Sequence, residues 1–171
     1  MMNRFVLAAA GLLAAGHVGA ADRVELTTRV SGVVAEVLVK AGQRTEKGRV
    51  LLRLDPTILQ ARLDEAAAEQ MRAEADAADA ARDLERAREL YARTVSSTTE
   101  LDAAVLRDAR AKATLGAAQA RHAVAKKDLA DAELKAPFAG VVQAVPGQPG
   151  TVVSADCQPK TLVILGAGGR P

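Results

Sequence analysis

Residues 56–133 decide the fold, and they read PTILQARLDEAAAEQMRAEADAADAARDLERARELYARTVSSTTELDAAVLRDARAKATLGAAQARHAVAKKDLADAE. The stretch is rich in Ala, Arg, Glu and Asp, has no proline after Pro56 and has one glycine, Gly116. Its only interruption is a run of small, mostly hydroxyl-bearing residues at 94–99. This pattern predicts two long helices that fold back on each other.

Apolar residues recur along both arms at alternating spacings of three and four, which is typical of a coiled-coil seam. In the first arm the seam comprises Leu59, Leu63, Ala66, Gln70, Ala73, Ala77, Ala80, Leu84, Ala87 and Tyr91. In the second arm it comprises Leu101, Ala104, Asp108, Ala111, Leu115, Ala118, His122, Ala125, Leu129 and Ala132. With about 38 residues in each arm and about 1.5 Å of rise per residue, we expect the hairpin to reach roughly 55 Å.

The ends of the two arms carry helix signals. Asp55 can accept orphan amide groups at the start of the first arm, where Pro56 suits the first helical position. Ser97 and Glu100 fit a capping box that begins the second arm. Pro137 is expected to end that arm by pushing the residue before it out of helical conformation.

Short β segments flank the hairpin. In 30–40, residues 33, 35, 37 and 39 alternate with 34, 36, 38 and 40, which predicts a strand with Val33, Ala35, Val37 and Val39 on one face. Turns at Gly42 and Gly48 lead into a second strand at 50–54. Residues 138–145 repeat the Gly-Val-Val pattern of 30–37, and an extended piece at 151–153 and a last strand at 161–165 follow. Neither half can bury its apolar face alone, so we expect the halves to pair at the base of the hairpin.

The N-terminus has the features of an export signal. Arg4 precedes an apolar run, 5–15, that is too short to span a bilayer, and small residues follow it. We expect cleavage after Ala20 or Ala21, with an uncleaved anchor as the alternative. The predicted organisation is a signal peptide (1–20), a first β half (21–55), the hairpin (56–133), a second β half (134–165) and a tail (166–171).

Composition argues against several classes of function. The formal net charge is +2 and the basic residues alternate with acidic ones, so nucleic acid is not an expected partner. Cys157 is the only cysteine and cannot form an internal disulfide. Loss of His17 with the signal peptide would leave His122 and Cys157, far apart in sequence, so we expect no metal. No serine or cysteine has a visible base partner, so we expect no enzymatic activity. We also expect no cofactor.

Two segments, RVSGVVAEVLVKAGQ at 29–43 and LKAPFAGVV at 134–142, carry a resemblance to a known family. Their arrangement around a helical hairpin resembles the periplasmic adaptor, or membrane fusion protein, family of bacterial efflux and secretion systems, including adaptors of RND-type pumps. The resemblance implies an α+β fold in which a lipoyl-like β-sandwich is split by a long antiparallel α-helical coiled-coil hairpin. It also implies a periplasmic homo-oligomer that links an inner-membrane transporter to an outer-membrane channel.

The tip of the hairpin adds a second match. Adaptors of three-part efflux pumps carry there an Arg, a Leu four residues later and a Ser seven beyond that, and Arg86, Leu90 and Ser97 have this spacing. The resemblance implies that these three residues bind the outer-membrane channel. Three other interpretations stay open: Arg86 as a solvated charge, Leu90 packed beside the seam, and Ser97 as a helix cap alone.

One departure from the family pattern leaves alternatives open. The family normally continues into a β-barrel and a membrane-proximal domain that meet the transporter, whereas six residues follow Leu165 here. The chain could be a short adaptor, a companion that reaches the transporter through a fuller adaptor, or a truncated remnant. A coiled-coil scaffold without a transport role is another alternative. A lipoyl or biotinyl carrier is disfavoured, because Lys47 and Lys135 lack the sequence context of a modified lysine.

Overall fold

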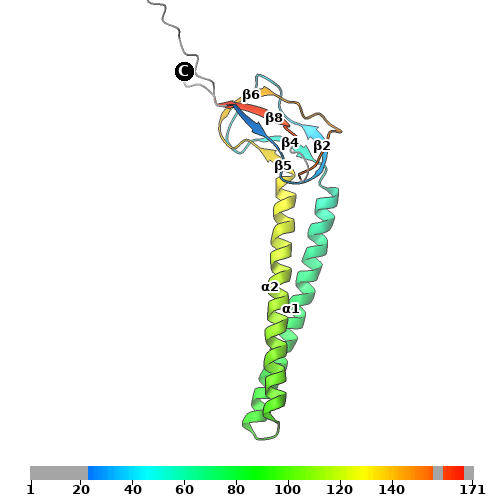
Figure 1. The fold of residues 1–171 in the computed structure, drawn as a ribbon, viewed down its shortest axis with the longest axis vertical. Helices are drawn as coiled ribbons and strands as arrows, with labels where there is room; N and C mark the ends of the chain where they lie inside the picture. The colour runs from blue at the N-terminus through cyan, green and yellow to red at the C-terminus, as the bar shows by residue number, and fades with distance from the viewer. Residues whose placement is uncertain (1–22, 156–159, 168–171) are drawn as a thin grey trace, which may run out of the picture.

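Two long helices dominate the computed structural model, which describes residues 23–155 and 160–167 (Figure 1). Helix α1 spans Thr57–Ala92 and helix α2 spans Thr98–Asp131. They run antiparallel as a hairpin that projects from a small β unit, as predicted. In the described part of the chain, neither helix has an apolar stretch sufficient to cross a membrane.

The predicted seam is the surface through which the two helices pack. Every predicted seam residue is buried or half-buried except Tyr91, and the fully buried ones include Ala73, Ala77, Ala80, Leu84, Ala104 and Ala118. Alanine has almost no side chain beyond the backbone, so it lets the two helices approach closely. The cross-helix ion pairs Glu69–Arg121, at 2.8 Å, and Asp83–Arg107, at 3.7 Å, fix the antiparallel register.

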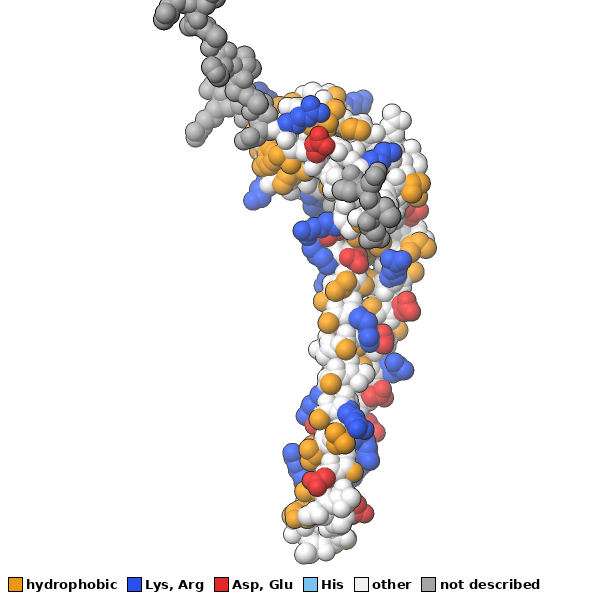
Figure 2. Space-filling view, in the orientation of Figure 1, with side chains coloured by type: hydrophobic (Ala, Val, Ile, Leu, Met, Phe, Trp, Pro, Cys, Tyr) orange, Lys and Arg blue, Asp and Glu red, His pale blue; other side chains and the backbone are white. Residues whose placement is uncertain are grey.

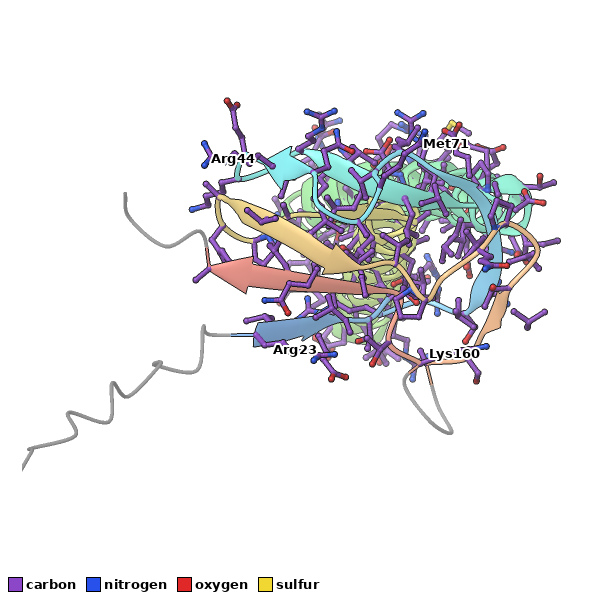
Figure 3. The ribbon with its side chains drawn as sticks, turned by 90° about the horizontal axis from the view of Figure 1, so that it is seen from above. Arg23, Arg44, Met71 and Lys160 are labelled. Atoms are coloured by element: carbon purple, nitrogen blue, oxygen red, sulfur yellow. The ribbon has the colours of Figure 1, made fainter. Side chains whose placement is uncertain are left out.

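The β unit consists of two four-stranded sheets. The strands are β1 Arg23–Leu26, β2 Gly32–Val37, β3 Arg44–Thr45, β4 Val50–Leu54, β5 Glu133–Lys135, β6 Gly140–Ala144, β7 Val152–Val153 and β8 Val163–Ala167. One sheet has the order β1-β8-β6-β3, which Figure 3 shows from above, and the other has the order β5-β4-β2-β7. Each sheet therefore mixes strands from before and after the hairpin. This confirms the prediction that the two β halves pair and gives the chain its α+β, lipoyl-like fold.

The two halves repeat the same hydrogen-bonding pattern. The amide of Gly42 donates to the Val142 carbonyl at 2.7 Å, and the Val142 amide donates to the Gln43 carbonyl at 2.9 Å. In the other half, the amide of Gly150 donates to the Val34 carbonyl at 2.8 Å, and the Val34 amide donates to the Thr151 carbonyl at 2.9 Å. Gly42 and Gly150 have the same φ of +83°, which only glycine adopts at little cost. An approximate two-fold axis thus relates the halves.

The core of the β unit lies between the two sheets and draws on both halves. Its fully buried side chains are Leu51, Leu52, Leu54, Leu162, Leu165, Val34, Val142 and Val163. Leu59 from the start of α1 and Ala132 from just after α2 belong to the same cluster. The base of the hairpin is therefore packed into the core, which fixes the direction in which the helices leave it.

The predicted single face of 33, 35, 37 and 39 does not hold along the whole segment. Val33 is 41% exposed and Val34 is 1% exposed, whereas farther along Leu38 is 40% exposed and Val39 is 4% exposed. A register shift between Val34 and Glu36, where β2 pairs with β4, accounts for the difference. A bulge places one extra residue in a strand, so the alternation changes face there. Strand β6 has the corresponding shift between Val142 and Ala144.

The second arm is shorter than predicted. Helix α2 ends at Asp131, well before Pro137, and Glu133 begins β5 rather than ending the hairpin. The amide of Leu54 donates to the Ala132 carbonyl at 2.8 Å, so pairing with β4 stops the helix there. At the other end of the chain, β8 continues to Ala167, two residues beyond the predicted β half. The expected signal peptide and Cys157 lie outside the described residues.

Candidate partner-binding site at the hairpin tip

The end of α1 is a Schellman motif, a turn in which two amides close back on the last helical turn. The Thr94 amide donates to the Tyr91 carbonyl at 2.9 Å, and the Val95 amide donates to the Leu90 carbonyl at 3.0 Å. Thr94 takes the left-handed position of the motif with a φ of +61°. Glycine is the usual residue there, and a β-branched side chain makes this conformation strained.

The start of α2 is the predicted capping box. The Ser97 hydroxyl accepts from the Glu100 amide at 3.3 Å, and the Glu100 carboxylate accepts from the Ser97 amide at 3.0 Å. At the start of α1, Asp55 accepts from the Thr57 amide at 2.9 Å and from the Thr57 hydroxyl at 2.6 Å. These two bonds, the hydroxyl first, lower the pKa of Asp55. Both predicted N-terminal caps are therefore present.

The three predicted tip residues are all exposed. Arg86 and Leu90 are one helical turn apart on one side of α1, where residues four apart are neighbours. Leu90 is 45% exposed, and the Arg86 guanidinium pairs with Asp83 one turn earlier. Ser97 begins the other helix, beyond the turn. The structure thus places the three residues at one end of the hairpin, with the Leu90 side chain partly open to solvent.

Sequence reasoning missed other apolar residues near the tip. Tyr91 was placed on the seam, but it is 42% exposed, because the chain turns two residues later and little of α2 faces it. Val95, in the turn itself, is 70% exposed. The sequence could have pointed to Val95, because it is the one apolar residue within the turn at 94–99. Together with Leu90, these side chains form an exposed apolar group, which we call the tip cluster.

The base of the hairpin holds an ionic network across three strands. Arg53 on β4 pairs with Glu36 on β2 at 2.8 Å and with Glu133 on β5 at 3.0 Å, and Lys135 pairs with Glu133 at 3.0 Å. The bonds to Glu36 and then Glu133 raise the pKa of Arg53. The bonds from Lys135 and Arg53 lower the pKa of Glu133. The network joins the strand that enters the hairpin to the strand that leaves it.

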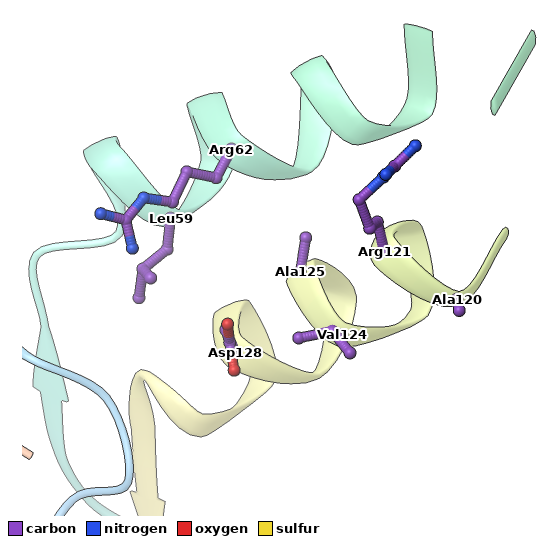
Figure 4. Close-up of a pocket in the computed structure, with 7 residues that line it drawn as sticks. All are labelled: Leu59, Arg62, Ala120, Arg121, Val124, Ala125 and Asp128. Atoms are coloured by element: carbon purple, nitrogen blue, oxygen red, sulfur yellow. The ribbon is translucent and has the colours of Figure 1, made fainter. Parts of the chain in front are cut away.

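An open groove of about 280 Å³ lies near the base between α1 and α2 (Figure 4). Leu59 and Arg62 line it from α1, and Ala120, Arg121, Val124, Ala125 and Asp128 line it from α2. Within the described residues, no group of three or more His, Cys, Asp or Glu side chains could hold a metal ion. His122 is half-buried at its predicted seam position.

The chain resembles proteins of known families along most of its length. Residues 22–162 match the family described as CzcB-like, barrel-sandwich hybrid domain. The efflux pump periplasmic linker BepF of Brucella suis is 34% identical over 91% of this chain and 42% of its own length. The multidrug resistance protein MdtA of Pectobacterium carotovorum is 31% identical over 73% of this chain and 30% of its own. The chain therefore spans less than half the length of these relatives.

Solved structures share the fold. A putative efflux transporter from Bacteroides eggerthii superposes with a TM-score of 0.62 at 24% identity, over 86% of this chain and 40% of its own. ZneB from Cupriavidus metallidurans gives a TM-score of 0.62 at 20% identity, over 87% of this chain and 62% of its own. At these identities the likeness supports the fold alone. Taken with the family match and the relatives, it shows that the chain belongs to the non-enzymatic periplasmic adaptor, or membrane fusion protein, family and covers its lipoyl-like and hairpin parts.

Proposed function

We propose that this protein is a periplasmic adaptor subunit of a tripartite efflux or secretion system and that its hairpin tip binds an outer-membrane channel. In this proposal Arg86, Leu90 and Ser97 contact the channel. The observation that carries it is the tip cluster: Leu90, Tyr91 and Val95 are exposed at the end of the shaft farthest from the β unit. Exposed apolar groups at a defined end of a molecule mark interaction sites.

The position of Arg86 supports the same proposal. Its side chain is exposed and lies on α1 one turn before Leu90, so it can offer a cation beside the tip cluster. A guanidinium is suited to carboxylates and backbone carbonyls, because its donors form a planar fork. Ser97 keeps its hydroxyl as an acceptor for the Glu100 amide, and its oxygen remains at the surface. A polar and an apolar anchor thus lie close together at one end.

We further propose that the protein acts in the periplasm after export by a cleaved signal peptide. Its relatives include proteins named efflux pump periplasmic linkers, and residues 1–20 have the pattern of an export signal. The β unit at the opposite end of the shaft would face the inner membrane. There it would join an inner-membrane transporter, either directly or through a fuller adaptor.

Photo-crosslinking in cells tests the proposal. A photoreactive residue at position 90 or 97 is expected to capture an outer-membrane channel protein. The same residue at position 58, which is exposed at the base of α1, is the matched control and is expected not to do so. Capture of only soluble or inner-membrane proteins from positions 90 and 97 would contradict the proposal.

Charge reversal tests the side chains themselves. Arg86→Asp and Leu90→Asp are expected to abolish efflux or secretion in a complementation assay while helicity by circular dichroism stays unchanged. Arg88→Asp is the matched control, because Arg88 pairs one turn back with Glu85 just as Arg86 pairs with Asp83. Equal losses for Arg86→Asp and Arg88→Asp would show that the position of Arg86 has no special role.

A further inference from the structure

An open groove of about 520 Å³, which we call the junction groove, lies where the hairpin meets the β unit. Strands β2 and β4 form one wall, and the end of α2 with the start of β5 forms the other. Pockets of roughly 300–1,000 Å³ hold drug-sized molecules. Figure 2 shows acidic, basic and hydrophobic side chains side by side where the shaft meets the β unit. The apolar lining of the groove comprises Ala35, Leu54, Pro56, Leu129, Ala130 and Ala132.

The charged lining of the junction groove is a row of three side chains, Glu36, Arg53 and Glu133, across three neighbouring strands. The Arg53 guanidinium donates to Glu36 at 2.8 Å and to Glu133 at 3.0 Å, so both carboxylates are held in place. Lys135, which pairs with Glu133, lines a neighbouring groove instead. Two carboxylates and one guanidinium give the lining of the junction groove a net charge of −1.

The approximate two-fold axis shows that the fold does not require an ion pair at this position. In the first half, the pair that follows the β2 bulge is Glu36 with Arg53. In the second half, the pair that follows the β6 bulge is Ala144 with Ile164. The equivalent position thus accepts two apolar residues, and half-exposed ion pairs contribute little to stability. The charges of the first half are therefore available for a ligand.

The bulge in β2 turns two consecutive residues toward the junction groove. Successive side chains of a regular strand point to opposite faces. Ala35 and Glu36 are nevertheless both exposed, and both line the groove, at the point where the register shifts. A bulge re-aims side chains in this way. The small side chain of Ala35 leaves space beside the Glu36 carboxylate, which is 48% exposed and has room for a further hydrogen-bond donor.

We propose that the junction groove binds a small amphipathic cation. The Glu36 carboxylate accepts hydrogen bonds from the ammonium group, and the apolar part of the ligand lies against Leu54 and Leu129. A ligand carboxylate in the same place would face two carboxylates of the protein and be repelled. Because the walls belong to both the hairpin and the β unit, a bound ligand stabilises their attachment. The inference goes beyond the proposed function, because it does not depend on what the tip binds.

Three compounds that share a phenylbutyl body test the charge preference. Phenylbutylamine is a cation at neutral pH, phenylbutanol is neutral and phenylbutyrate is an anion. In titrations followed by the NMR shifts of backbone amides, the amine is expected to bind about fivefold more tightly than the alcohol, and phenylbutyrate is expected to bind least. The shifts are expected at Ala35, Leu54 and Ala130. Equal binding of the three compounds, tighter binding of phenylbutyrate, or shifts only elsewhere would overturn the proposal.

Removal of one carboxylate tests the role of Glu36. Glu36→Gln is expected to lower the affinity for phenylbutylamine about fivefold and to leave the affinity for phenylbutanol unchanged. Glu25→Gln is the matched control, because Glu25 is an exposed carboxylate on β1 that pairs with Ile164 of the other half, outside the junction groove. Unchanged binding of the amine by Glu36→Gln, or an equal loss in both variants, would contradict the proposal.

A bulky side chain tests the place of binding. Ala35→Phe fills the junction groove from an exposed position and is expected to abolish the binding of both phenylbutylamine and phenylbutanol. Gln143→Phe is the matched control, because Gln143 is the exposed residue in the corresponding bulge of β6 and is expected to leave binding unchanged. Circular dichroism checks that both variants stay folded. Wild-type binding by a folded Ala35→Phe variant would show that the ligand lies elsewhere and would overturn the proposal.

Discussion

Thr94 shows how a single residue shapes the tip. Its left-handed φ closes the Schellman motif that ends α1, although threonine is poorly suited to that conformation. The turn directly precedes Val95 and leads to Ser97, so the strained residue holds the exposed end of the hairpin in place. The sequence predicted a turn at 94–99 but not this geometry, because no glycine or asparagine marks the left-handed position.

Thr94→Gly is expected to increase the free energy of unfolding by about 1 kcal/mol, because glycine removes the strain of a β-branched residue at positive φ. Chemical denaturation followed by circular dichroism measures the change. Thr114→Gly is the control: Thr114 lies in the middle of α2, and glycine there is expected to lower stability. A loss of stability in Thr94→Gly would mean that the threonine side chain makes a compensating contact.

Two seam residues, Asp108 and Tyr91, have surroundings that the sequence pattern could not predict. Asp108 sits on the seam as predicted, and its buried carboxylate accepts from the Lys112 ammonium at 2.7 Å while its other oxygen has no partner among the described residues. A polar exception in an apolar repeat could have signalled either an open seam or a buried group, and only the structure distinguishes them. The prediction for Tyr91 was wrong for a different reason. The seam spacing continues in the sequence as far as residue 91, but the chain turns there and little of α2 faces the side chain.

Among the elements, the helices could be predicted well and the strands less well. A repeat sustained over 36 residues in α1 and 34 in α2 carries many independent signals, so the hairpin, the seam of each arm and the capping box could be predicted from the sequence. Strand β5 could not be predicted in this way. Glu133–Lys135 pairs with β4 through its backbone, and its three side chains show no pattern that indicates a strand. The bulge in β2 likewise has no local signature, so the sequence predicted one unbroken alternation where the structure changes face.

The cap of α2 offers a way to separate folding from partner binding. Ser97→Ala is expected to lower stability by about 1 kcal/mol, because it leaves the Glu100 amide without its acceptor. Ser97→Asp keeps an acceptor at the cap and is expected to retain wild-type helicity, yet it replaces the hydroxyl at the tip with a charge. Thermal unfolding and complementation assays on both variants measure the two effects. If Ser97→Asp is fully active, Ser97 serves as a helix cap and not as a contact.

At the level of the whole molecule, the network around Arg53 ties the hairpin to the β unit. Because Lys135 and Arg53 lower the pKa of Glu133 in the folded protein, the ionised carboxylate stabilises the fold. This contribution is fully present above the ordinary pKa of 4.5 and is lost as the pH falls through the lower folded-state value. The stability of the base is therefore expected to fall in acid.

Comparison of the wild type with Glu133→Gln tests this linkage. The wild type is expected to have the higher melting temperature at pH 7, and the gap is expected to close as the pH falls below 4.5, where the protonated carboxyl resembles the amide. Glu46→Gln is the control, because Glu46 is exposed and is expected to show no such gap. A gap that persists unchanged at low pH would mean that the charge of Glu133 does not stabilise the base.

The attachment of the hairpin also determines how the molecule carries mechanical load. Helix α1 continues from β4 and α2 leads into β5, and these neighbouring antiparallel strands meet the shaft at the same end of the β unit. A pull on the tip therefore draws both strands in one direction and does not peel one from the other. The tension falls on the β2–β4 ladder in shear, where hydrogen bonds perpendicular to the strands must break together. The attachment therefore resists extension along the shaft through several hydrogen bonds at once.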